Sequence, residues 1–104
     1  MKKILVYLPE EITGKALRNS IDAVFDPEKI VFSMDLKTML RTNEYGLVID
    51  ATTLGKKQGE KGLVEGRLES LVLESRPDVV CVYDPLTVLA DIRNIAVKYY
   101  GGEK

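Results

Sequence analysis

The chain has 104 residues, of which 45% are hydrophobic and 30% are charged, a composition typical of one globular domain rather than of a disordered chain. Fifteen basic and sixteen acidic side chains leave a net charge of −1, which disfavours nucleic acid and acidic membranes as partners for the surface as a whole. One cysteine and no histidine exclude an internal disulfide, catalytic triads of the usual kind and zinc sites built from cysteine and histidine.

The first half of the chain alternates between apolar runs and helical periodicity. Residues 4–8 form a short apolar run that predicts a strand buried on both faces. Apolar side chains recur every three or four positions over residues 10–25, which predicts a helix. Residues 30–34 predict a second strand, after which Asp35 is expected to cap a short helix that residues 43–46 break.

The third predicted strand is followed by a segment of a different kind. Residues 47–51 are apolar except for Asp50, and because no helix starts directly after them, Asp50 is expected to have no helix to cap. Residues 52–62 read TTLGKKQGEKG and contain three glycines, three lysines and almost no apolar side chain. We expect residues 52–62 to form a flexible loop.

The last part of the chain repeats the alternation. Residues 63–75 predict a helix and residues 79–83 a fourth strand. The pair Asp84-Pro85 is expected to open a last helix, which the pair Gly101-Gly102 closes.

Strands and helices therefore alternate along the whole chain, and the strands are apolar on both faces. This pattern predicts a three-layer α/β fold in which helices cover both faces of a short parallel sheet. We expect one domain over residues 1–104, with four strands in the order 2-1-3-4, a shortened flavodoxin-like topology. No secretion signal or membrane-length apolar run is visible, so we expect a cytoplasmic protein without membrane contact.

The fourth strand lies at an edge of this predicted sheet. Residues 79–83 read VVCVY and contain no charge, proline or glycine that would protect the edge from another strand. We expect a homodimer, formed by pairing of this edge or by packing through the last helix. The alternative is that the last helix and the tail shield the edge within a monomer. Cys81 is expected to be a small buried hydrophobic residue rather than a nucleophile.

Ligands of open parallel sheets bind beyond the carboxyl ends of the strands, where the strand order reverses. The polar residues expected at this edge are Glu10, Glu11, Asp35, Asp50, Thr52, Thr53 and Asp84. Of these, Glu10, Asp50 and Asp84 are the candidates for a Mg²⁺ site, because magnesium prefers one or two carboxylates together with water and phosphate. Helix capping accounts equally for Asp35 and Asp84, and a favourable position in a first helical turn accounts for Glu10 and Glu11.

Asp50 is the first candidate for a functional residue, although a hydrogen bond from loop amides is a common structural use of such an acid.

The loop that follows is the second candidate. Its glycines can turn backbone N–H groups toward an anion and its lysines add positive charge, so it could bind phosphate. The ligand-binding residues expected here are Asp50, Thr52, Thr53, Gly55, Lys56, Lys57, Gly59 and Lys61. The loop matches neither of the common glycine-rich nucleotide motifs, and a loop that meets a protein partner or is simply solvated fits the same composition.

The segments KKILV, EYGLVIDA and PDVVCV resemble the corresponding strands of receiver domains from bacterial two-component systems. The resemblance implies that Asp50 accepts a phosphoryl group, with Mg²⁺ held by an acidic pair that ends the first strand. The chain departs from the family in three respects. Its first strand ends in Leu8-Pro9, its fourth ends in Asp84 where a receiver has serine or threonine, and the fifth strand with its lysine is missing. Asp50 is the one position that corresponds in role.

Two functions of different classes follow. The preferred one is a small regulatory or binding module that holds a phosphate-bearing ligand or a protein partner at the carboxyl ends of the strands, chiefly through residues 52–62. The alternative is a Mg²⁺-dependent phosphoryl-transfer or phosphodiester-cleaving enzyme that uses Asp50. Three lysines beside a glutamate on an acidic chain predict at most weak, salt-sensitive contact with nucleic acid.

Overall fold

The computed structural model describes residues 3–7, 15–33, 35, 44–70 and 76–101. Its strands are β1 (Lys3–Tyr7), β2 (Ile30–Ser33), β3 (Tyr45–Asp50) and β4 (Asp78–Cys81). Its α-helices are α1 (Lys15–Val24), α3 (Leu63–Glu69) and α4 (Val88–Tyr100), and one 3-10 turn, η1 (Pro27–Lys29), precedes β2. The predicted helix after Asp35 lies outside the described residues, as do Leu8 and residues 9–14 and 71–75.

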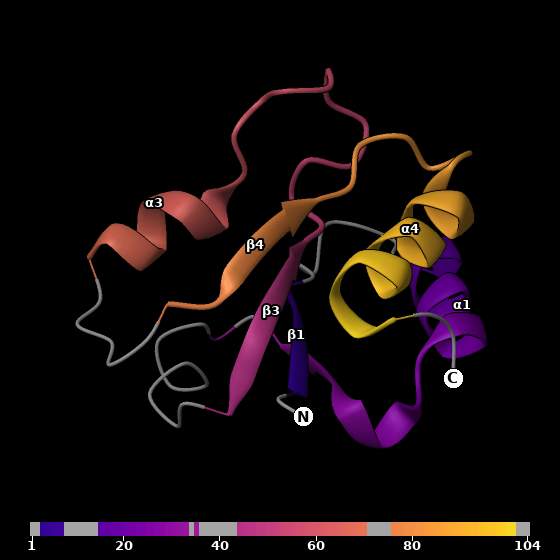
Figure 1. The fold of residues 1–104 in the computed structure, drawn as a ribbon. Helices are drawn as coiled ribbons and strands as arrows, with labels where there is room; N and C mark the ends of the chain where they lie inside the picture. Colours follow the sequence, from indigo (N-terminus) through magenta and orange to yellow (C-terminus); the bar gives the residue numbers. More distant parts are fainter. Residues whose placement is uncertain (1–2, 8–14, 34, 36–43, 71–75, 102–104) are drawn as a thin grey trace.

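All four strands are parallel and form one sheet in the order β2-β1-β3-β4, which confirms the predicted α/β class and strand order. In Figure 1, α1 and α4 cover one face of this sheet and α3 covers the other. Because each inner strand is covered on both faces, side chains of both parities along β1 and β3 are buried. This is the reason why their sequences are apolar runs rather than alternating patterns.

The core has two parts, one on each face of the sheet. On the face of α1 and α4, side chains such as Ile4, Ile49 and Ile92 form the larger cluster. On the face of α3, Leu5, Tyr7, Tyr45, Val48, Val64 and Leu68 form the smaller one. Asp50 has the same parity as Val48 along β3, so its carboxylate belongs to the face that α3 covers.

Several element boundaries differ from those predicted, among them the end of α3, which stops at Glu69 with Ser70 as its C-cap, short of residue 75. β3 begins at Tyr45, within the predicted break, because Tyr45 is buried and pairs with Lys3 across the start of β1. β4 ends at Cys81, because the Tyr83 carbonyl accepts a hydrogen bond from the Gly55 N–H at 2.7 Å and so belongs to the loop connection.

The last helix also begins later than predicted. Its N-cap is Thr87, whereas the Asp84 side chain accepts a hydrogen bond from the Leu86 N–H at 2.8 Å and forms a separate turn before it. The predicted end is confirmed, since Gly101 takes the left-handed conformation that closes a helix, with φ of 76°. Within the residues described, no helix is long and apolar enough to cross a membrane.

Candidate functional site

The Asp50 side chain is buried beneath the segment that follows β3. The side chain is 0% exposed. Its Oδ1 accepts hydrogen bonds from the Thr52 N–H at 2.8 Å and from the Thr52 hydroxyl at 2.5 Å. Its Oδ2 accepts a hydrogen bond from the Val64 N–H at 3.2 Å. Both carboxylate oxygens are therefore engaged within the chain.

These bonds cap the N-terminus of α3. The N-cap residue, Gly62, has no side chain with which to satisfy the first helical amides. The Leu63 N–H instead donates to the Thr52 hydroxyl oxygen at 3.0 Å, and the Val64 N–H donates to Asp50. The expectation that Asp50 has no helix to cap was wrong, because the loop returns to the carboxyl end of β3 before α3 begins.

Gly62 is the residue that allows this close approach. A Cβ atom built on Gly62 would lie 1.9 Å from Asp50 Oδ2 and 2.8 Å from Thr52 Oγ1. Such distances lie far inside van der Waals contact, so any side chain at this position would displace the buried carboxylate. In the sequence, Gly62 is recognisable only as the last residue of a glycine-rich loop, and this role was not predicted.

Residues 52–62, which we call the arch, are also attached to the end of β4. The buried Thr53 hydroxyl donates to the Val82 carbonyl at 2.7 Å. The Gly55 N–H donates to the Tyr83 carbonyl at 2.7 Å, and the Tyr83 hydroxyl donates to the Glu60 carbonyl at 2.9 Å. Thr53 and Gly55 therefore attach the first part of the arch to the residues that follow β4, and Glu60 attaches its second part. The bonds from Leu63 to Thr52 and from Val64 to Asp50 fix the point where the arch ends and α3 begins.

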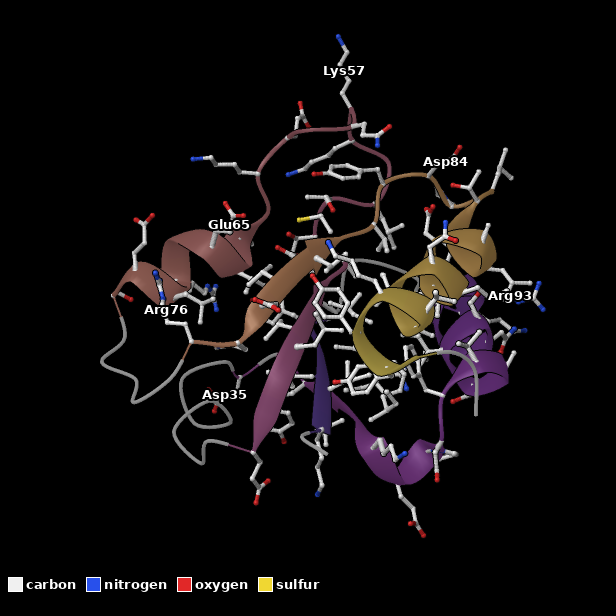
Figure 2. All side chains as sticks on the ribbon, viewed as in Figure 1. Asp35, Lys57, Glu65, Arg76, Asp84 and Arg93 are labelled. Atoms are coloured by element: carbon white, nitrogen blue, oxygen red, sulfur yellow. The ribbon has the colours of Figure 1, made fainter. Side chains whose placement is uncertain are left out.

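The outer side of the arch carries its charged side chains. Lys56, Lys57 and Lys61 are all exposed. Figure 2 shows Lys57 at the tip, directed away from the sheet. Gly55 and Gly59 have φ of 83° and 95°, a backbone conformation that favours glycine and lets the segment turn sharply twice. Of the predicted ligand-binding residues, Asp50, Thr52 and Thr53 thus lie buried at the base, and the glycines and lysines lie on the arch.

The predicted carboxylate cluster is not assembled by the residues described. Asp84 is exposed, and its carboxylate accepts the Leu86 N–H in the turn before α4 (Figure 2). Glu10 and Glu11 lie outside the described residues. Asp35 donates its N–H to the Ser33 hydroxyl oxygen at 3.0 Å. Within the described ranges, no group of three or more histidine, cysteine, aspartate or glutamate side chains could hold a metal ion.

Cys81 lies at the end of β4, beside Asp50 in the strand register. Its side chain is only partly buried, where a buried one was predicted, because β4 has a neighbouring strand on one side only in the described sheet. Burial, and then the negative charge of Asp50, raise the pKa of the Cys81 thiol above its ordinary value, while polar groups of Tyr83, Thr53 and Gly62 lower it in part. The thiol is therefore protonated at neutral pH, which disfavours a role as nucleophile.

The alkylation rate of Cys81 tests this description. In the folded protein, the rate of reaction with iodoacetamide is expected to rise with pH around a midpoint above that of an ordinary thiol, because the pKa of Cys81 is raised. In urea, where burial and the Asp50 charge are lost, the midpoint should fall to the ordinary thiol range of about 8.5. A folded-state midpoint below that of the unfolded chain would show an activated thiolate and contradict the assignment.

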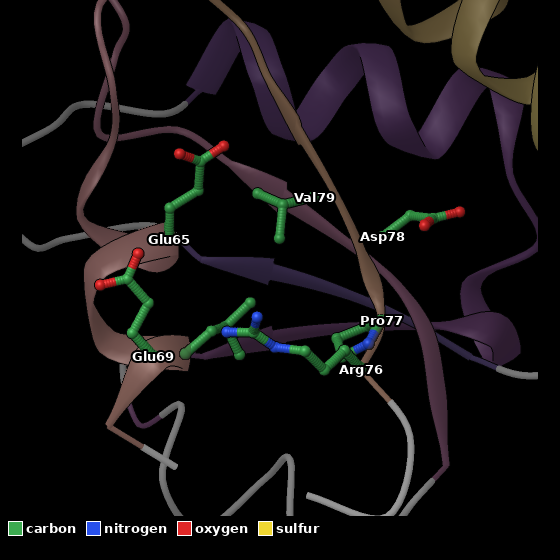
Figure 3. Close-up of a pocket in the computed structure, with 7 residues that line it drawn as sticks. Glu65, Glu69, Arg76, Pro77, Asp78 and Val79 are labelled. Atoms are coloured by element: carbon green, nitrogen blue, oxygen red, sulfur yellow. The ribbon is translucent and has the colours of Figure 1, made fainter.

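A groove that sequence analysis did not predict lies between α3 and the start of β4 (Figure 3). It has a volume of about 320 Å³ and is open to solvent, and its lining residues are Glu65, Leu68, Glu69, Arg76, Pro77, Asp78 and Val79. The spacing of Glu65 and Glu69, one helical turn apart, is the signal in the sequence that could have indicated an acidic face here. The groove extends along α3 from Glu65 in its first turn to Glu69 at its end, and it meets β4 at the start of that strand (Figure 3).

Comparisons with known proteins add no family to this geometry. No family model, curated protein or solved structure matches the chain.

Proposed function

We propose that the protein is a non-enzymatic binding module whose arch takes a phosphate-bearing ligand. The observation that carries this proposal is the placement of three exposed lysines, Lys56, Lys57 and Lys61, on a segment tied to the sheet at several points. Asp50, Thr52 and Thr53 are then the residues that hold the arch, and Gly55, Gly59 and the lysines form the side that meets the ligand.

The charge of the arch favours an anion. Three lysines and one glutamate give these eleven residues a formal charge of +2 (3 − 1), on a chain whose net charge is −1. Lysine ammonium groups bind phosphate as point charges and draw anions toward the surface that carries them.

The attachment of the arch reduces the entropic cost of binding. A free loop loses conformational freedom when it closes on a ligand, and this loss weakens affinity. Here the bonds from Thr53 to Val82, from Gly55 to Tyr83 and from Tyr83 to Glu60 already restrict the arch. The lysines therefore start from a restricted backbone, although their own side chains stay flexible.

Catalysis is less well supported. A magnesium-dependent phosphoryl transfer needs carboxylates that share a metal ion with the phosphate. The Asp50 oxygens accept hydrogen bonds from Thr52 and Val64, and the Asp84 carboxylate is engaged in its own turn. The arrangement favours binding without turnover.

Removal of the arch charges tests the proposal. The triple variant Lys56→Gln, Lys57→Gln, Lys61→Gln is expected to weaken the binding of pyrophosphate and of adenosine triphosphate by tenfold or more, measured by calorimetry at low ionic strength. The physical reason is the loss of three charge-assisted contacts, each of which contributes about 1 kcal/mol or less at an exposed site.

A matched control removes the same charge elsewhere. Lys3 starts β1, Lys29 directly precedes β2 and Lys98 lies in the last turn of α4, whereas the arch follows the carboxyl end of β3. All three are exposed, so their joint replacement by glutamine should leave affinity within about twofold. Equal weakening by both triple variants would show a nonspecific effect of net charge. Failure of the wild-type protein to bind either probe would remove the arch as an anion site.

A further inference from the structure

The two limbs of the arch are attached to the fold in different ways. In Figure 1 the arch leaves the end of β3 and returns to the start of α3. In its first limb, residues 52–56, the Thr53 hydroxyl donates to the Val82 carbonyl at 2.7 Å. The Gly55 N–H donates to the Tyr83 carbonyl, also at 2.7 Å. Both acceptors belong to the backbone, so the attachment of the first limb does not depend on which side chains follow β4.

The second limb, residues 57–61, depends on a side chain. The Tyr83 hydroxyl donates to the Glu60 carbonyl at 2.9 Å. The other hydrogen bond described for this limb joins the Glu60 N–H to the Lys57 carbonyl at 3.1 Å and lies within the limb. It closes a turn in which Gly59 has a positive φ of 95°. The Tyr83 hydroxyl is therefore the group that fixes this turn to the rest of the fold.

Lys61 stands between two restricted neighbours. Before it, the Glu60 carbonyl accepts the Tyr83 hydroxyl. After it, Gly62 packs against the buried Asp50 carboxylate. The exposed Lys61 side chain thus extends from a backbone that is held on both sides, and one of the two restraints is a single hydroxyl group.

From these bonds we infer that the Tyr83 hydroxyl is a positioning group, which holds Lys61 where it binds the same phosphate-bearing ligand as Lys56. The inference rests on the function proposed for the arch. Without the hydroxyl, the second limb gains conformational freedom that ligand binding must remove again, and this cost weakens affinity. Lys56 does not depend on the hydroxyl, because the first limb keeps its bonds to backbone carbonyls.

The first test measures the freedom of the second limb without any ligand. Tyr83→Phe keeps the ring and removes the hydroxyl, so trypsin is expected to cleave after Lys61 about threefold faster than in the wild type, as followed by mass spectrometry. Tyr99→Phe on α4 is the matched control, since it makes the same chemical change away from the arch, and it should be cleaved after Lys61 at the wild-type rate. An unchanged rate in Tyr83→Phe would overturn the inference, whether or not the arch binds phosphate.

The second test is a double-mutant cycle, with pyrophosphate binding measured by calorimetry at low ionic strength. Tyr83→Phe alone is expected to raise the dissociation constant about threefold. Lys61→Gln should raise it about threefold in the wild type but less than about 1.5-fold in Tyr83→Phe, because Lys61 is no longer held there. Lys56→Gln is the matched control, and it should raise the dissociation constant by the same factor in both backgrounds.

The two tests separate failure of this inference from failure of the proposed function. If Lys61→Gln weakens binding by the same factor in both backgrounds, Tyr83 does not position Lys61, and the arch remains an anion site. If the wild type does not bind pyrophosphate, the proposed function fails and the positioning role fails with it. The trypsin result then shows only whether Tyr83 restrains the second limb.

Discussion

Gly62→Ala is expected to lower the free energy of unfolding by about 3 kcal/mol or more. The new Cβ would lie 1.9 Å from Asp50 Oδ2 and 2.6 Å from Asp50 Cγ. The carboxylate is buried and cannot swing into solvent, so relief of the clash breaks its hydrogen bonds with Thr52 and Val64. The two amides and the carboxylate would then be buried without partners.

Gly66→Ala is the matched control for this prediction. Gly66 is an exposed glycine within α3, and a Cβ there would have no atom within 4 Å. The change should therefore stabilise the protein by about 0.5–1 kcal/mol, the ordinary gain of alanine over glycine in a helix. Urea denaturation of both variants measures the difference. A Gly62→Ala protein as stable as the wild type would show that Asp50 does not approach Gly62 as described.

The fold was largely predictable because it depends on patterns that are local in the sequence. Strands covered on both faces must be apolar at every position, so β1 and β3 were recognisable without knowledge of their neighbours. Helical crossovers between parallel strands then restrict the strand order to a few arrangements.

The first residue of a helix was less predictable where two neighbouring residues could each serve as its N-cap. Asp84 and Thr87 are both acceptable N-cap residues, and Asp84 precedes a proline, which favours it in the sequence. In the structure the Asp84 carboxylate satisfies the Leu86 N–H, and the helix starts after Thr87. Composition cannot decide between such neighbouring caps, because both residue types can accept a hydrogen bond from a first-turn amide, and in the structure the Thr87 side chain makes no such bond.

The base of the arch was predictable in part. Asp50 stood out because it is an acid within an apolar run, and a hydrogen bond from loop amides was one expected use. Its other partner, the Val64 N–H, is fourteen residues away and is brought close only when the loop folds back. The requirement for glycine at position 62 follows from that return path, so no local pattern in the sequence indicates it.

Asp50→Asn is expected to lower the free energy of unfolding by about 2–3 kcal/mol. The amide retains one oxygen, which can accept from the Thr52 N–H and hydroxyl at the position of Oδ1. Its NH₂ group then replaces Oδ2 and faces the Val64 N–H, so two donors meet in a buried space. Reversal of the amide merely moves the mismatch to Thr52. The cost includes the loss of a charge-assisted bond and the burial of an unsatisfied donor.

Asp84→Asn is the control, because Asp84 is exposed and an amide oxygen can still accept the Leu86 N–H, so stability should change by less than about 0.5 kcal/mol. The decisive comparison combines urea denaturation with pyrophosphate calorimetry. If Asp50 anchors the arch, Asp50→Asn lowers the free energy of unfolding. The folded fraction of the variant then still binds pyrophosphate, with an affinity reduced only by the added conformational freedom of the arch. If Asp50 is instead a ligand-binding or phosphoryl-accepting residue, the variant keeps its stability and loses binding. That second result would reverse the assignment of Asp50 and leave the lysines of the arch as part of a different site.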